Sequence, residues 1–162
     1  MPQVVAQVWV PVPRAVAFAV SQTTGAARLA WDPFIRSQHL VGADRPGTDV
    51  RTFTRARVGG LRGFAMVSRY VSYRPPTPVG MTVERGPWFF ARFGGGWRFG
   101  PTTRDGVAGT TATWKYTYGL RPHLLSLVAE PVGQRLLGRV IRVRIEAFRR
   151  ACSDPGTLRA AL

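Results

Sequence analysis

Short runs of β-branched and aromatic residues, separated by turn residues, alternate along the chain from residue 4 to residue 118. Their lengths predict seven strands, at 4–12, 35–41, 48–58, 64–73, 79–85, 88–99 and 110–118. Pro13 suits the first turn of a helix, and two short helices are expected at 14–22 and 26–30. Gly59-Gly60 marks a break between strands, and Gly94-Gly95-Gly96 predicts a bulge within the sixth strand.

Beyond residue 124 the hydrophobic spacing changes from a strand pattern to a helical one. The apolar positions that recur at this spacing are Leu136, Leu137, Val140, Ile141, Ala147 and Phe148. They predict one long C-terminal helix, which Pro131 either kinks or begins. For a chain of 162 residues, we expect an α+β domain over 1–152 and a C-terminal tail over 153–162.

Several short turn and packing motifs resemble those of a known family. They are Trp31-Asp32-Pro33 at the second strand, Pro46-Gly47-Thr48 at the third, Trp97 and Phe99 in the sixth, and Gly109-Thr110-Thr111 followed by Thr113 in the seventh. With the element order, they resemble the START-like (SRPBCC) superfamily over nearly the whole chain. The helix at 131–150, rich in leucine and arginine, is similar to the polyketide cyclase/dehydrase branch, with a coenzyme Q-binding-like branch as the alternative.

This resemblance implies a helix-grip fold, in which a curved, seven-stranded antiparallel sheet wraps around the long C-terminal helix. Two short helices follow the first strand in this fold. The resemblance also implies a hydrophobic cavity between the sheet and the helix. It does not imply the identity of the ligand, because one fold hosts many functions.

Charged residues indicate which face of each strand points inward, because successive side chains alternate and unpaired charges seldom enter a core. Together with the apolar side of the C-terminal helix, this predicts a cavity lined by Ser37, His39, Thr52, Thr54, Met66, Ser68, Tyr70, Trp97, Phe99, Trp114, Tyr116, Val140 and Arg144. A set that mixes aromatic rings with hydroxyls is typical of a small-molecule pocket. The alternative is that the threonines and serines are strand formers that bond to nearby backbone.

Arg144 is the most informative single residue of this set, because it falls near the middle of the apolar side of the predicted helix. A buried and unpaired guanidinium is costly. Arg144 is therefore expected to meet an acidic residue, backbone carbonyls, or a ligand that carries an anion or a carbonyl group. The alternative is that its aliphatic stem lies on the core while its charge reaches water.

The candidates for catalysis are Arg144, Tyr116, Tyr70 and His39. In an aromatase/cyclase, which the family resemblance allows, Arg144 would steady an enolate oxygen while Tyr116, Tyr70 or His39 moves protons. The sequence contains no Ser/His/Asp pattern, Walker loop or dinucleotide fingerprint. One cysteine, Cys152, and two histidines cannot form a His/Cys metal cage, so we expect neither a metal nor a cofactor.

Charge is the outlier of the composition, with 23 basic residues against 8 acidic ones and a net charge of +15. All of the basic residues except Lys115 are arginine, a bias that a GC-rich genome also produces. A stripe on the polar side of the C-terminal helix consists of Arg135, Arg139, Arg142 and Arg149. Such a stripe attracts RNA or anionic lipid, although a charged stripe is often only a solvated face.

Three functions remain open at this point. The first is binding of a polyketide-, quinone- or lipid-like molecule in the cavity, the second is an aromatase/cyclase that uses the same cavity, and the third is association with RNA, ribosomes or membranes. The apolar stretch at 4–12 is too short to span a membrane and has no basic segment before it, so we expect a cytoplasmic protein. The oligomeric state is left open.

Overall fold

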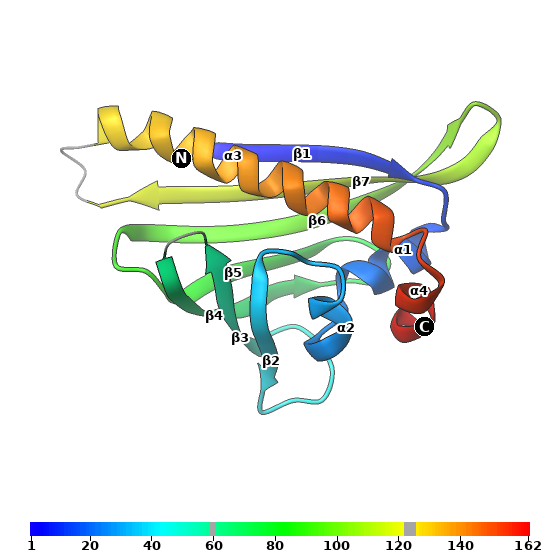
Figure 1. Cartoon of the computed structure of the whole chain (residues 1–162), viewed down its shortest axis with the longest axis horizontal. Helices are drawn as coiled ribbons and strands as arrows, with labels where there is room; N and C mark the ends of the chain where they lie inside the picture. Colours follow the sequence, from blue (N-terminus) through cyan, green and yellow to red (C-terminus); the bar gives the residue numbers. More distant parts are fainter. Residues whose placement is uncertain (59–60, 122–125) are drawn as a thin grey trace.

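Seven strands form one antiparallel sheet that curls around a long C-terminal helix, as the sequence predicted (Figure 1). The computed structural model describes residues 1–58, 61–121 and 126–162, so that the Gly59-Gly60 break lies outside the described residues. In order across the sheet, the strands are β1 (Gln3–Val10), β7 (Val107–Leu120), β6 (Phe90–Arg104), β5 (Val79–Arg85), β4 (Leu61–Tyr73), β3 (Arg51–Val58) and β2 (Ile35–Val41). The helix-grip fold is confirmed.

The helices occupy one side of this sheet. Two short ones, α1 (Arg14–Ser21) and α2 (Gly25–Leu29), follow β1, and α3 (Ser126–Ala151) runs along β1 and β7 (Figure 1). Pro131 lies inside α3, five residues after its first residue, Ser126. The helix therefore does not begin at Pro131, which was one of the two possibilities that the sequence left open. A helix tolerates proline best near its first turn, where the missing N–H has no intrahelical partner.

The segment expected as a C-terminal tail contains a further helix, α4 (Pro155–Ala161). Asp154 caps it, because the carboxylate accepts a hydrogen bond of 2.7 Å from the backbone N–H of Thr157. Leu158 and Ala161 pack against the hydrophobic core, and α4 contacts both α1 and α2. The last residues of the chain therefore cover the end of the fold at which α3 finishes.

The hairpin between β6 and β7 is longer than the sequence indicated. Its turn is Asp105-Gly106, in which both residues have positive φ, of 51° and 77°. A turn with two residues in this region matches the right-handed twist of the strands, and an Asp-Gly pair is a favoured sequence for it. The dipeptide was therefore a hairpin signal that strand alternation alone did not reveal.

The triple glycine of β6 does not form the predicted bulge. Residues 94–96 pair in continuous register with β7, from Gly94 opposite Thr117 to Gly96 opposite Lys115. The reason for glycine here is space: a Cβ on Gly95 would lie 3.1 Å from Cδ1 of Tyr116. Glycine thus makes room for the Tyr116 ring on the inner face of the sheet, where the functional site is found.

Candidate functional site

A cavity of about 130 Å³ lies between the inner face of the sheet, the α1–α2 region and α3. The expected residues that line it are Thr52, Thr54, Met66, Ser68, Tyr70, Trp97, Trp114, Tyr116, Val140 and Arg144. They come from β3, β4, β6, β7 and α3, so the alternation of side chains was assigned correctly on these elements. That they contact a ligand stays a prediction.

The inward assignment was wrong on β2. A β-bulge between Ile35 and Ser37 breaks the alternation, because Ile35 pairs with Ala56 whereas Ser37 pairs with Arg55. Arg36 and Ser37 consequently both lie off the inner face, and His39 is exposed. Neither Ser37 nor His39 lines the cavity. His39 therefore cannot act as an acid or base on a molecule in this cavity.

The bulge brings Gln38 to the cavity in place of these two residues. Its Nε2 donates a long hydrogen bond of 3.4 Å to Oγ1 of Thr54. Its Oε1 is buried and accepts no hydrogen bond from the described residues. Sequence reasoning missed Gln38 because a bulge leaves no clear signal in a strand of seven residues.

Phe99 is buried, as expected, but it does not line the cavity. Its ring packs edge to face on Phe18, at 5.8 Å between centroids, and stacks on Trp97 at 5.6 Å. Phe99 is thus a core residue of the fold, stacked on Trp97, which lines the cavity.

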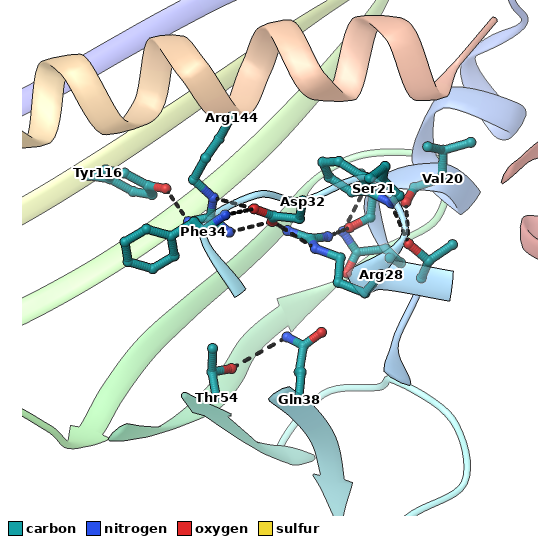
Figure 2. A network of polar contacts seen from close by, with 12 residues as sticks. Val20, Ser21, Arg28, Asp32, Phe34, Gln38, Thr54, Tyr116 and Arg144 are labelled. Carbon is teal, nitrogen blue, oxygen red and sulfur yellow. Dashed lines mark hydrogen bonds and ion pairs between the residues drawn. The ribbon is translucent and has the colours of Figure 1, made fainter. Parts of the chain in front are cut away.

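Arg144 finds an acidic partner in the structure, which was one of its predicted possibilities. Figure 2 shows Arg144 reaching from α3 to Asp32, with Arg28 of α2 on the other side of the same carboxylate. Nε and Nη2 of Arg144 donate to Oδ1 and Oδ2 of Asp32 at 3.0 and 2.7 Å. Nε and Nη2 of Arg28 lie 2.9 Å from Oδ2. These three residues are called the Arg28–Asp32–Arg144 cluster below.

The cluster joins three parts of the fold. The side chain of Asp32 has no exposure, and those of Arg28 and Arg144 are 8% and 10% exposed. Asp32 also accepts a hydrogen bond of 3.2 Å from the backbone N–H of Phe34, which fixes the entry to β2. The carboxylate therefore holds α2, the start of β2 and α3 together around one side of the cavity.

Aromatic rings enclose the Arg144 guanidinium. Its carbon lies 4.3 Å from the ring centre of Trp114 and 4.6 Å from that of Phe34, within the range of cation–π attraction. Nη1 donates a hydrogen bond of 2.5 Å to the hydroxyl of Tyr116 (Figure 2). Arg144 therefore occupies a fixed position, rather than extending past its stem to water.

The charges in the cluster perturb one another. Burial raises the pKa of Asp32, but Arg144 and Arg28 outweigh burial, so that the pKa lies below its usual value. Burial and the repulsion from Arg144 lower the pKa of Arg28, against the attraction of Asp32. Arginine nevertheless stays charged in proteins. The cluster therefore carries two positive charges and one negative charge.

Two tyrosines add hydroxyls to this side of the cavity. Burial raises the pKa of Tyr70 to about 12, and burial also raises the pKa of Tyr116. Both phenols therefore keep their protons at neutral pH. The Tyr116 oxygen accepts from Arg144, and neither hydroxyl donates to a partner among the described residues. The two protons are available to a ligand in the cavity.

Sequence reasoning also missed Arg28 and Asp32. Asp32 was noticed only as part of the Trp31-Asp32-Pro33 turn, and Arg28 was not singled out. Their separation of four residues was the available signal, because oppositely charged residues at this spacing commonly pair in helical geometry. Their link to Arg144 spans 112 positions in sequence, and no local pattern reveals it.

The basic stripe of α3 is exposed at Arg135, Arg139, Arg142 and Arg149. Arg149 is paired with Glu146, with Nη2 2.5 Å from Oε1. The other three form no ion pair with the part of the chain that the structure describes. No helix in the described ranges is long and apolar enough to cross a membrane.

The curled sheet, the long helix and the cavity between them define a protein with the helix-grip fold, which a solved START superfamily protein shares. More specifically, the chain belongs to the family described as polyketide cyclase / dehydrase and lipid transport, whose model matches residues 1–153. This confirms the polyketide cyclase/dehydrase branch of the resemblance. No curated protein matches the chain in sequence.

Solved structures support the fold. A protein from Thermus thermophilus is 17% identical, with a TM-score of 0.72 over 99% of both chains. A START superfamily protein from Mycobacterium smegmatis is 14% identical, with a TM-score of 0.72 over 93% of this chain and 97% of the other. The protein XoxI from Bacillus cereus is 13% identical, with a TM-score of 0.69 over 95% and 97%. At these identities, the likeness extends to the fold alone.

Proposed function

We propose that this protein binds a compact hydrophobic small molecule in the cavity between the sheet and α3. The observation that carries the proposal is the cavity itself, whose wall combines Trp97, Trp114 and Met66 with the hydroxyls of Tyr70 and Tyr116. A concave, mostly apolar site with a few placed polar groups is what recognition of a small molecule requires. The family description, which includes lipid transport, supports the same function.

The size of the cavity restricts the ligand. An apolar cavity of about 150 Å³ accommodates benzene. The cavity here measures about 130 Å³, which corresponds to about one ring. A multi-ring polyketide, a quinone with its tail or a long acyl chain would require the walls to move apart. A molecule with one ring is therefore the best fit to the observed volume.

Binding without turnover fits the site better than cyclisation. The contact between Arg144 and Tyr116 provides a cation and a hydroxyl that could stabilise an enolate oxygen, which is the observation in favour of a cyclase. A cyclase also needs a group that accepts a proton near neutral pH. His39 is off the cavity, and the raised pKa values of Tyr70 and Tyr116 keep both phenols protonated at neutral pH, so that neither is free to accept a proton.

Filling the cavity should abolish binding. Ser68 is buried on the cavity wall, and Ser68→Phe would place a ring in the ligand volume. We expect toluene, phenol or indole at saturation to raise the melting temperature of the wild type. A ligand at about 100 times its Kd adds about 2.7 kcal/mol, or roughly 5–11 °C for this chain length. The Ser68→Phe variant should show no such rise.

The matched control is Ser37→Phe, the same substitution at a position that the sequence placed in the cavity and the structure does not. This variant should keep the ligand-induced rise in melting temperature. A rise that survives in Ser68→Phe, or that disappears equally in Ser37→Phe, would show that the ligand binds elsewhere. Isothermal titration of both variants with the same compounds gives the affinities directly.

Attraction of a polyanion to α3 is the alternative, and it depends on a different surface. The Arg139→Glu/Arg142→Glu variant reverses two exposed charges without touching the cavity. We expect the variant to weaken association with RNA or with vesicles of anionic lipid. High salt should also remove this association, because it is electrostatic. Sedimentation with vesicles and titration with labelled RNA would measure it. Unchanged binding to both partners would exclude this face of α3.

A further inference from the structure

The Arg28–Asp32–Arg144 cluster retains hydrogen-bond donors that no described residue satisfies. A guanidinium carries five N–H groups, with two on each terminal nitrogen. In Arg28, Nε and Nη2 contact Asp32, and Nη1 donates to the backbone oxygen of Ser21 at 2.5 Å. In Arg144, Nε and Nη2 contact Asp32, and Nη1 donates to Tyr116. Each terminal nitrogen therefore keeps one N–H without a partner in the described ranges.

The cluster also retains an uncompensated positive charge. Both guanidinium groups form ion pairs with Asp32 alone, across all the residues that the structure places. Their side chains are 8% and 10% exposed, so water screens this charge poorly. A buried charge without a partner is costly, and the cost falls when an anion approaches. Both arginines line the cavity, so the cavity is where such an anion can reach them.

Two tyrosine hydroxyls lie beside the same charges. Tyr116 is bonded to Arg144, and Tyr70 lines the same cavity as Arg28. An anionic group in this part of the cavity would thus meet guanidinium N–H groups and phenol O–H groups together. Carboxylate oxygens accept several such bonds, and bonds to charged donors are the strong ones.

We propose that the ligand is a small carboxylic acid with about one ring, whose carboxylate binds to Arg28 and Arg144 while the ring lies among the apolar residues of the cavity. This inference rests on the proposed function, because it concerns the same cavity. The competing interpretation is that the cluster only ties α2 to α3, with water at the remaining N–H groups. That interpretation predicts no preference for acids.

Pairs of compounds that differ only in charge test the inference. Benzoate and benzamide form one pair, phenylacetate and phenylacetamide a second, and cyclohexanecarboxylate and its carboxamide a third. At neutral pH, we expect at least one acid to bind the wild type on the order of ten- to hundred-fold more tightly than its amide. Hydrogen bonds to charged groups stabilise a complex more than bonds to neutral groups do, which gives a difference of this size. The preference should persist at high salt, because the site is buried.

The variant Arg28→Met assigns this preference to the cluster. It leaves Asp32 and Arg144 as a neutral pair and removes the excess charge. We expect the preference for acid over amide to fall by on the order of ten-fold or more. Arg36→Met is the matched control, because Arg36 is exposed on β2 and the substitution changes the net charge by the same amount. It should keep the preference.

The outcomes separate this inference from the proposed function. Equal binding of acid and amide by the wild type, or binding of toluene and indole but of no acid, would overturn the inference and leave the cavity function in place. An unchanged preference in Arg28→Met would overturn the assigned site. If no aromatic compound binds at all, the cavity function fails as well. The comparison on the wild type decides the inference even if Arg28→Met does not fold.

Discussion

Replacing Asp32 by asparagine is expected to lower the free energy of unfolding by about 3–5 kcal/mol, because it leaves two buried guanidinium groups without a counter-charge. Asp32 receives charged hydrogen bonds from both Arg28 and Arg144, and its side chain has no exposure. For a chain of this size, the loss corresponds to a fall in melting temperature of roughly 6–20 °C. Urea unfolding at neutral pH and thermal melting measure it.

The control for this prediction is Arg28→Met, which removes one positive charge and leaves Asp32 paired with Arg144. Exchange of one member of a buried ionic group for an apolar residue can be close to neutral when the remaining charges balance. We therefore expect a clearly smaller loss of stability than for Asp32→Asn. Equal losses in the two variants would contradict the view that charge balance, rather than packing, makes Asp32 important.

The pH dependence of the same effect has a definite sign. The pKa of Asp32 is lowered in the folded protein relative to a usual value of about 3.9. The stabilisation from the ionised carboxylate is therefore fully present above about pH 4 and is lost as pH falls through the lower folded pKa. The difference in unfolding free energy between the wild type and Asp32→Asn should narrow below about pH 4. A constant difference would show that the charge of Asp32 is not its source.

Much of the cavity could be predicted because its determinants are local. On β3, β4, β6 and β7, an outward charge fixes the strand face, and residues such as Thr52, Ser68 and Tyr116 follow from alternation alone. On β2 the same rule failed for Ser37 and His39, because a single bulge reverses every assignment beyond it. Arg36 is exposed and lies within the bulge, so using its charge to assign the outer face of β2 placed Ser37 and His39 on the inner face, which was wrong.

The charged part of the site could not be predicted, for a different reason. The helical pattern placed Arg144 on the buried side of α3, where its charge needs a partner. The candidates were eight acidic residues or a ligand, and sequence spacing does not rank partners that the fold brings together. Only the packing of the segment between α2 and β2 against α3 selects Asp32. The excess charge of Arg28 became visible once this pairing was known.

The position of Arg144 in turn depends on how α3 is seated on the sheet. Phe148, one helical turn beyond Arg144, is fully buried. Its ring lies 4.8 Å from that of Trp97 and 5.9 Å from that of Trp31, measured between centroids. Trp97 also lines the cavity and stacks on Trp114 at 4.1 Å. The aromatic core beneath the end of α3 and the wall of the cavity are therefore one continuous packing unit.

Phe148→Ala should consequently destabilise the fold by about 3–5 kcal/mol, the usual cost of removing a buried phenylalanine ring. Because Arg144 lies on the same helix, the variant should also weaken binding of the acids beyond what its lower stability explains. Leu136→Ala is the control, since Leu136 is 61% exposed on α3, and its effect should stay within about 0.5 kcal/mol. Urea unfolding measures stability, and titration of the folded variant measures affinity. If Phe148→Ala lowers the free energy of unfolding by no more than Leu136→Ala does, the packing of α3 against the aromatic core described here is wrong.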